Sequence, residues 1–135
     1  MLKKISHIAL AVGNLDRAIE FYHDVLGLTI TDRQVVEEQK AEVCFVEIGG
    51  TTKLELIAPT SDDSPVAKSI AKKGPGIHHI CFEVDNIEER LHWLEDHGIK
   101  LVNKEPRKGA EGGKIAFLHP TSTLGALMEL CEGCH

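Results

Sequence analysis

The stretch Ile5-Ser-His-Ile-Ala-Leu-Ala-Val-Gly-Asn14 returns later in the chain as Ile77-His-His-Ile-Cys-Phe-Glu-Val-Asp-Asn86. The second copy lies 72 residues after the first, and further matching segments follow both copies at nearly the same offset. Such self-similarity is typical of a duplicated structural unit. The sequence therefore predicts two related modules, residues 1–73 and 74–135, which share one domain of 135 residues.

Both modules predict the same order of elements. Alternating apolar residues indicate a strand at 4–12 and at 77–84. Asn14 and Asn86 are typical helix N-caps and Gly27 and Gly98 typical helix stops, so a helix is expected after each strand. Three more strands are expected in each module, near 28–36, 42–48 and 52–58 and near 99–103, 113–119 and 125–131. A short helix at 64–73 connects the modules, and 104–113 is expected to be a loop. The fold class is α+β, with the pattern βαβββ twice.

The composition excludes several classes of function. The formal charge of −6 disfavours nonspecific binding to nucleic acid or an anionic membrane, and an aromatic content of 4% argues against a base-stacking surface. No apolar run is long enough to cross a bilayer, and the first residues do not resemble a secretion signal. We therefore expect a soluble, cytoplasmic protein that binds neither nucleic acid nor membrane and keeps its four cysteines reduced.

Strand alternation separates two faces on the first strand of each module. The bulky apolar residues share one face, where the helix is expected. His7 and its counterpart His79 share the other face with small neighbours, which leaves room for a ligand. Glu55 and Glu129 lie between apolar residues on the last strand of each module. Each module thus offers one histidine and one glutamate to the open face.

These four side chains predict a metal site. A buried carboxylate or imidazole is costly without a partner, and coordination of one divalent cation would relieve all four groups together. Two nitrogen and two oxygen ligands suit zinc, cobalt, manganese, nickel or iron(II) and leave positions for water and substrate. Surface glutamates and satisfied core histidines are the alternative, and the repetition of the pattern in both modules argues against it. The predicted ligands are His7, Glu55, His79 and Glu129.

The chain as a whole resembles a known family. Over nearly its full length it is similar to the methylmalonyl-CoA epimerases of the vicinal oxygen chelate (glyoxalase) superfamily. The stretches that carry the resemblance are Glu20-Phe-Tyr-His-Asp-Val-Leu-Gly27, Gly76-Ile-His-His-Ile-Cys-Phe-Glu-Val84, Glu105-Pro-Arg-Lys-Gly-Ala-Glu-Gly112 and Ala116-Phe-Leu-His-Pro120. The third of these stretches is closer to the epimerases than to the superfamily at large.

The resemblance implies a fold, an activity and a cofactor. The two modules would lie side by side in a curved mixed sheet around one divalent ion (Zn, Co, Mn or Ni), and the chain would form a homodimer. The activity would be that of an isomerase that interconverts the C2 epimers of methylmalonyl-CoA, an acyl-CoA substrate. The enzyme would remove the α-proton and stabilise the enolate, with the metal as Lewis acid.

Inversion at carbon requires one acid/base group on each face of the substrate. Glu129 is the candidate for one of them. Some family members carry an acid on the third strand of the first module, where this chain has Val43. The neighbouring Glu42 faces the opposite side by strand alternation, and its more ordinary interpretation is a surface glutamate.

A basic cluster lies in the 104–114 stretch of this acidic chain. Lys104, Arg107 and Lys108 either belong to a solvated loop or bind the phosphates of coenzyme A, and the sequence leaves both open. His119, just before Pro120, is either a further substrate contact or a turn residue.

The four cysteines differ in their expected roles. Cys131-Glu-Gly-Cys134-His135 matches a haem-attachment pattern, but without an export signal we expect no haem there. We expect this terminal pair to have no role, and a terminal metal half-site or an oxidised pair are the alternatives. Cys44 and Cys81 are expected to pack as small hydrophobic residues.

Two other functions are compatible with the predicted metal ligands. The same four ligands would also suit a glyoxalase I-type lactoylglutathione lyase, or a noncatalytic member that binds a small ligand or metal.

Overall fold

The computed structural model describes residues 2–110 and 112–134, which form two compact units. One unit is Ile8–His78, and the other combines the residues up to His7 with those from His79 onward. Both boundaries fall inside strands, in β1 (Leu2–Ala11) and in β5 (Gly76–Val84). The compact units and the sequence repeat thus divide the chain at different residues. The organisation as one domain stays a prediction.

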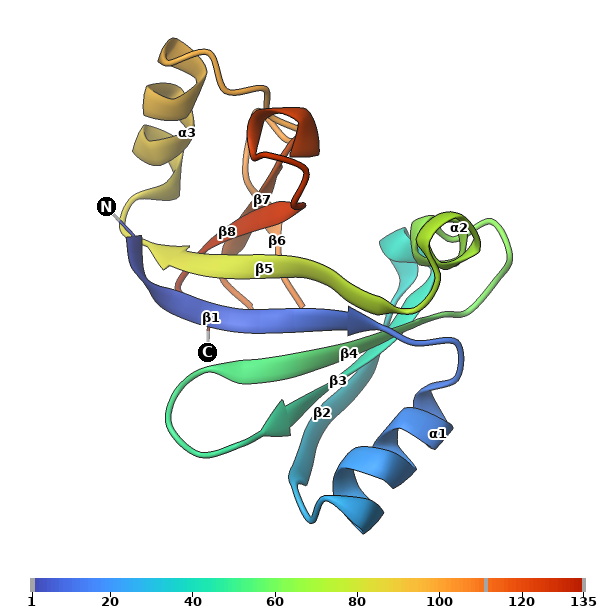
Figure 1. Ribbon diagram of the computed structural model, residues 1–135. Helices are drawn as coiled ribbons and strands as arrows, with labels where there is room; N and C mark the ends of the chain where they lie inside the picture. Colours follow the sequence, from blue (N-terminus) through green and yellow to red (C-terminus); the bar gives the residue numbers. More distant parts are fainter. Residues whose placement is uncertain (1, 111, 135) are drawn as a thin grey trace. The chain divides into compact units, whose positions relative to one another are not determined.

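The unit Ile8–His78 contains strands in the order β2-β3-β4-β1. β2 (Thr29–Val36), β3 (Ala41–Glu47) and β4 (Lys53–Pro59) are antiparallel neighbours. The helix α1 (Leu15–Ile19), extended by a π-helical segment η1 (Glu20–Val25), packs on this sheet (Figure 1). The predicted apolar face of β1 carries the helix, because Leu10 and Val12 pack with the buried Leu15 and Leu56.

Capping residues define where the helices of this unit begin and end. Asn14 Oδ1 accepts a hydrogen bond of 3.0 Å from the backbone N–H of Arg17, as expected for an N-cap. Gly27, with a φ of 75°, ends the helical segment in a conformation that favours glycine. Ser64 Oγ accepts from Val66 N and donates to the carbonyl of Gln39 in η2 (Glu37–Gln39), which anchors α2 (Pro65–Lys73).

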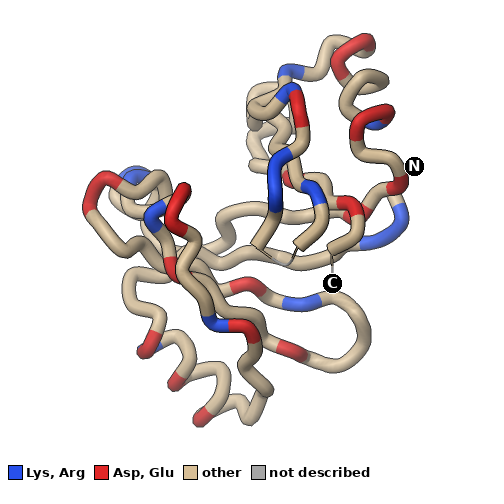
Figure 2. The backbone as a smooth tube through the Cα atoms, turned by 180° about the vertical axis from the view of Figure 1, so that it is seen from behind, with Lys and Arg blue, Asp and Glu red and all other residues tan. Residues whose placement is uncertain are grey.

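The other unit contains strands in the order β1-β5-β8-β7-β6. β5 pairs in parallel with β8 (Met128–Glu132), and β7 (Lys114–Leu118) is antiparallel to both β8 and the short β6 (Arg107–Lys108). Figure 2 shows the basic stretches of β6 and β7 side by side. The 3-10 turn η3 (Pro120–Ser122) precedes β8.

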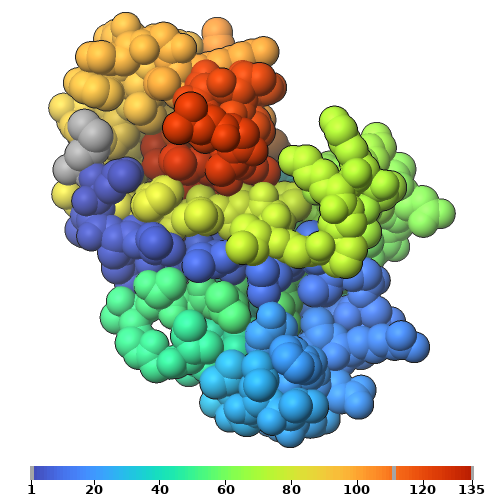
Figure 3. Space-filling model, viewed as in Figure 1, coloured from blue at the N-terminus to red at the C-terminus, as the bar shows by residue number. Residues whose placement is uncertain are grey.

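Helix α3 (Ile87–Asp96) covers one face of the strands in this unit. Its buried Ile87 and Leu91 pack with Leu118 and Leu130 in one apolar cluster. In Figure 3 the orange surface of α3 borders the red surface of the C-terminal segment. The backbone N–H of Ile87 donates a hydrogen bond of 2.7 Å to Glu132 Oε1, so a side chain of β8 caps the first turn of α3.

The doubled βαβββ order is confirmed, with two local corrections. The strand expected near 99–103 is reduced to one isolated bridge between Leu101 and Leu118, because the N–H groups of Val102 and Asn103 both turn onto the carbonyl of Phe117. The short β6 forms instead, inside the stretch expected to be a loop. No helix in the described part of the chain is long and apolar enough to span a membrane.

The prediction of four reduced cysteines is wrong for the C-terminal pair. Cys131 and Cys134 are joined by a disulfide. Gly133 between them has a φ of 69°, which turns the chain back after β8 and brings the two sulfurs together. Cys44 and Cys81 keep buried thiols.

Candidate metal centre

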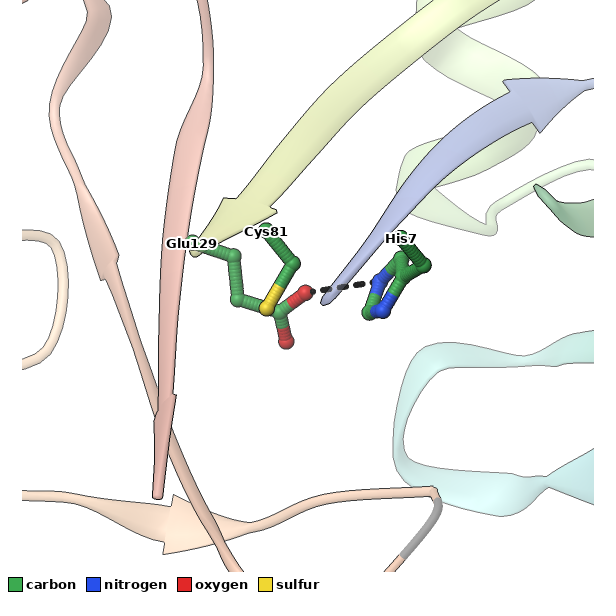
Figure 4. A group of neighbouring side chains, drawn as sticks. All are labelled: His7, Cys81 and Glu129. Carbon is green, nitrogen blue, oxygen red and sulfur yellow. Dashed lines mark ion pairs between the residues drawn. The ribbon is translucent and has the colours of Figure 1, made fainter. Parts of the chain in front are cut away.

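Three of the four predicted ligands meet in one unit. His7 on β1, His79 on β5 and Glu129 on β8 are each 5–6% exposed. The two Nε2 atoms are 3.3 Å apart, and Glu129 Oε1 lies 3.2 Å from Nε2 of His7 and 3.0 Å from Nε2 of His79. Figure 4 shows the contact between His7 and Glu129. The residues predicted from strand alternation therefore converge on one point.

The geometry of this triad fits a bound divalent ion. Tetrahedral nitrogen and oxygen ligands of zinc, at 2.0–2.2 Å from the ion, lie about 3.4 Å from one another. The three donor atoms are already at nearly these separations. Apart from its ion-pair contacts with the two imidazoles, the buried Glu129 Oε1 has no partner for hydrogen bonding among the described residues. A buried carboxylate oxygen in that state is costly, and coordination would compensate it.

The pKa of Glu129 reflects its two imidazole neighbours. Burial alone raises the pKa of this carboxyl, but the contacts with His7 and His79 outweigh burial and lower the pKa to about 2. Glu129 is therefore a carboxylate at neutral pH, which is the form that a metal ligand needs.

Neighbouring side chains hold the two imidazole rings in place. Ser6 Oγ, itself buried, lies 3.4 Å from Nδ1 of His7. The ring of His79 meets the ring of Phe117 edge to face, with centroids 5.3 Å apart. Phe117 is the register partner of Glu129 across β7 and β8. The pairing of these two strands therefore positions both Glu129 and the ring that packs against His79.

Cys81 lies beside this centre, whereas its sequence context predicted only a small hydrophobic residue of the core. The parallel pairing of β5 with β8 makes Cys81 the register partner of Glu129. The ligand atoms of His7, Cys81 and Glu129 all lie within 4.8 Å of one another, and Figure 4 shows the sulfur beside the carboxylate. Strand alternation already places Cys81 on the same face of its strand as His79. Its position next to Glu129 follows from the pairing of β5 with β8, which the sequence did not predict.

The other predicted site residues of the first module lie in the unit Ile8–His78. Glu55 is 6% exposed on β4, opposite Phe45 of β3. Val43 is buried on the same face of β3 as Phe45. Glu42 points to the opposite face, where its Oε1 accepts hydrogen bonds of 2.8 and 2.6 Å from Nε and Nη2 of Arg33.

Glu42 is therefore part of a surface ion-pair network. Arg33 also donates from Nη1 to Asp16 Oδ1 at 2.7 Å. The hydrogen bonds to Asp16 and Glu42 raise the pKa of the Arg33 guanidinium above its ordinary value. A carboxylate held by an arginine in this way is poorly suited to take a proton from a substrate.

The basic cluster of the second module borders a cavity of about 510 Å³. Lys104, Arg107 and Lys108 line it from the β6 side, and residues of α3, among them Glu88, line it from the other. Lys108 is the register partner of Lys114, whose Nζ binds Glu88 at 2.7 Å.

Strand register places Arg107 apart from Lys108. Arg107 is the register partner of Ile115, and Ile115 shares its face of β7 with Phe117, the partner of Glu129. By register, the Arg107 side chain therefore leaves the strand on the sheet face of the metal centre and that of Lys108 on the face that carries α3, although both residues line the cavity.

His119 and the C-terminal cysteines have local structural roles. The Nδ1 atom of His119 accepts a hydrogen bond of 3.2 Å from the backbone N–H of Thr121, so His119 caps η3. The haem-attachment pattern requires two free thiols, and Cys131 and Cys134 are bonded to each other. His135 of that pattern lies outside the described residues.

Comparison with known proteins identifies the family. The sequence profile of the Glyoxalase/Bleomycin resistance protein/Dioxygenase superfamily matches residues 6–117. The chain belongs to this superfamily. Its resemblance to the epimerases within the superfamily is also confirmed, because the relatives at 35–39% identity are named methylmalonyl-CoA epimerases.

Three epimerases are similar to this chain over almost its full length. The mitochondrial methylmalonyl-CoA epimerase of Bos taurus is 39% identical over 130 residues, which cover 96% of this chain and 74% of the bovine protein. The ethylmalonyl-CoA/methylmalonyl-CoA epimerase of Cereibacter sphaeroides is 35% identical over 132 residues, 96% of this chain and 98% of that protein. A methylmalonyl-CoA epimerase solved in complex with methylmalonyl-CoA and NH4+ has a TM-score of 0.92 at 36% identity, covering 98% of this chain and 95% of that one.

Proposed function

We propose that this protein is a metal-dependent epimerase that interconverts the C2 epimers of methylmalonyl-CoA. The observation that carries the proposal is the convergence of His7, His79 and Glu129 in a chain of this family. The similarity to epimerases, one of them solved with methylmalonyl-CoA, supports the choice of substrate.

In this proposal His7, His79 and Glu129 hold one divalent ion, and Glu55 completes the ligand set. Support for Glu55 comes from its burial and from its position in the repeat, which corresponds to that of Glu129. Two nitrogen and two oxygen donors favour zinc, cobalt, manganese or nickel over calcium or magnesium. When bound, such an ion supplies Lewis-acid stabilisation of the negative charge that develops on the substrate oxygens.

The α-proton of the substrate lies between a thioester and a carboxylate and is only weakly acidic. We assign Glu129 as one acid/base group, because it is ionised at neutral pH and can therefore accept a proton. Its contacts with His7 and His79 make it a weak base at rest. Movement of Oε1 away from the two imidazoles would raise its pKa towards the ordinary value and increase its basicity.

The coenzyme A part of the substrate is assigned to the cavity beside β6. Its volume of about 510 Å³ is typical of a small-ligand site. Lys104 and Lys108 bind the phosphates in this proposal, and Arg107, on the sheet face of Glu129, binds the ester nearer to the reacting carbon. His119 remains a proposed substrate contact. We further propose that the protein forms a homodimer and acts in the cytoplasm.

The deciding experiment is a measurement of deuterium incorporation. Purified protein is incubated with methylmalonyl-CoA in deuterated water, beside an assay with glutathione and methylglyoxal. We expect exchange at C2 and no lactoylglutathione, and His79→Ala should abolish the exchange. Lactoylglutathione formation without exchange at C2 would favour a lyase. Inactivity in both assays, with metal bound, would favour a noncatalytic binding protein.

A further inference from the structure

We propose that Cys81 is a sulfur ligand of the ion held by His7, His79 and Glu129, and that the centre therefore prefers a thiophilic divalent ion such as zinc, cobalt or cadmium. The inference rests on the metal centre of the proposed function and deepens it, because it names the ligand that decides which ion is bound.

The position of Cys81 follows from strand pairing. Because Cys81 and Glu129 are register partners in neighbouring parallel strands, their side chains leave the sheet on the same face. The sulfur lies within 4.8 Å of the ligand atoms of His7 and Glu129. An ion bound to sulfur at about 2.3 Å and to oxygen at about 2.1 Å would place these atoms about 3.6 Å apart. Rotation of the Cys81 side chain about its Cα–Cβ bond can supply the difference.

The state of Glu129 is a second, independent indication of a ligand. Its Oε1 is buried beside Cys81 and, apart from its ion-pair contacts with the two imidazoles, has no partner for hydrogen bonding in the described part of the chain. A thiol is a weak donor and would satisfy this oxygen poorly. A cation between the carboxylate and the sulfur would satisfy both atoms. The resulting set of nitrogen, oxygen and sulfur donors selects soft or borderline ions over manganese and magnesium.

Cys44 provides a contrast within the same chain. It is as fully buried as Cys81, but it lies in the apolar cluster of Leu15, Val46 and Leu56 under α1. Burial there raises the pKa of the Cys44 thiol to about 11. Cys44 thus has the surroundings of an inert structural cysteine and is a matched control.

The test measures the ligands of the bound ion directly. The protein carries Cys131→Ser and Cys134→Ser, so that this pair cannot bind metal. It is loaded with Co2+ and examined for thiolate-to-cobalt charge transfer in the near ultraviolet. The Zn2+ form is examined by X-ray absorption for a sulfur neighbour at about 2.3 Å. We expect one sulfur per ion. Cys81→Ser should remove it and lower the preference for Cd2+ over Mn2+ about tenfold or more, whereas Cys44→Ser should change neither.

The outcomes separate this inference from the proposed function. An ion bound only by nitrogen and oxygen would overturn the role of Cys81 and leave the epimerase proposal intact. Failure of the protein to bind any ion would overturn both the metal centre and the inference. A sulfur ligand in a protein without exchange at C2 would support Cys81 and contradict the epimerase. If Cys81→Ser does not fold, the protein with Cys44, Cys131 and Cys134 replaced decides, because Cys81 is then its only thiol.

Discussion

Glu129 contacts two imidazole nitrogens at 3.0 and 3.2 Å while its carboxylate is shielded from water. Either imidazole alone could be an ordinary core histidine with a neutral partner. Together with the buried Glu129 oxygen that contacts both of them, they form a preorganised set of donors. We therefore expect the individual side chains at this point to govern both the metal binding and the acid stability of the protein.

Removal of one imidazole should largely abolish metal binding. The proposed stoichiometry is about one divalent ion per chain, and His7→Ala or His79→Ala removes a direct ligand. Metal content after dialysis, measured by mass spectrometry, checks this expectation. Glu55→Gln should be milder than Glu55→Ala, because glutamine keeps an oxygen donor. Full occupancy in both histidine variants would exclude the proposed centre.

The low pKa of Glu129 predicts a loss of stability in acid. The folded-state pKa of about 2 lies below the ordinary value of 4.5, so the stabilisation is complete above about pH 4.5. It decreases as the pH falls towards 2, by on the order of 3 kcal/mol in the free energy of unfolding. Urea unfolding of the metal-free protein between pH 5 and pH 2.5 measures this.

Two variants make the acid-stability measurement specific. Glu129→Gln should make the loss of stability in acid less steep, because the amide does not titrate, although carboxyls with a lowered pKa such as Asp63 and Glu88 still do. Glu47→Gln, at an exposed strand end, should leave it unchanged. A Glu129→Gln protein that loses stability in acid as steeply as the wild type would contradict the assignment.

At the scale of elements, the alternation along β6 separates two neighbouring basic residues. Arg107→Gln should raise KM for the CoA ester about tenfold and reduce the salt dependence of kcat/KM, because a charge-assisted contact is lost. Lys108→Gln should raise KM less, by about twofold to fivefold, because one exposed lysine contributes only part of the proposed phosphate binding. In both variants kcat should stay unchanged, because these side chains would bind the ground state and the transition state equally well. Equal effects of the two substitutions would contradict the register argument.

The contact between β8 and α3 predicts a second effect at this scale. Glu132 Oε1 accepts the N–H of Ile87 at the positive end of the α3 dipole. Glu132→Ala should lower the free energy of unfolding by about 1–2 kcal/mol, and Glu132→Gln by less, because the amide keeps an acceptor. Chemical denaturation with Glu47→Ala as the control measures both. No change in the alanine variant would mean that this cap contributes nothing.

At the scale of the whole molecule, the ligand triad does not follow the repeat. His7 belongs to the first module in sequence, yet it lies in the compact unit that contains His79 and Glu129. A polypeptide of residues 74–135 therefore lacks a ligand and should bind Zn2+ at least about tenfold more weakly than the full chain. Addition of residues 1–73 should restore binding, as measured by equilibrium dialysis. Full affinity of 74–135 alone would show that His7 is dispensable.

The sequence by itself determined the repeated βαβββ order and the two faces of each first strand. Both follow from local physics: alternation exposes side chains with a period of two, and asparagine and glycine mark the ends of helices. These rules select His7, His79 and Glu129 as candidate ligands, because duplication makes each residue a check on another, and the structure brings the three together.

Only the tertiary structure decided which strands are neighbours. The parallel pairing of β5 with β8 brings Cys81 to Glu129, and the register of β6 on β7 turns Arg107 and Lys108 to opposite faces. The turn at Gly133 likewise joins Cys131 to Cys134. Strand neighbours depend on packing between segments far apart in the chain, and a local pattern of apolar residues contains no record of that choice.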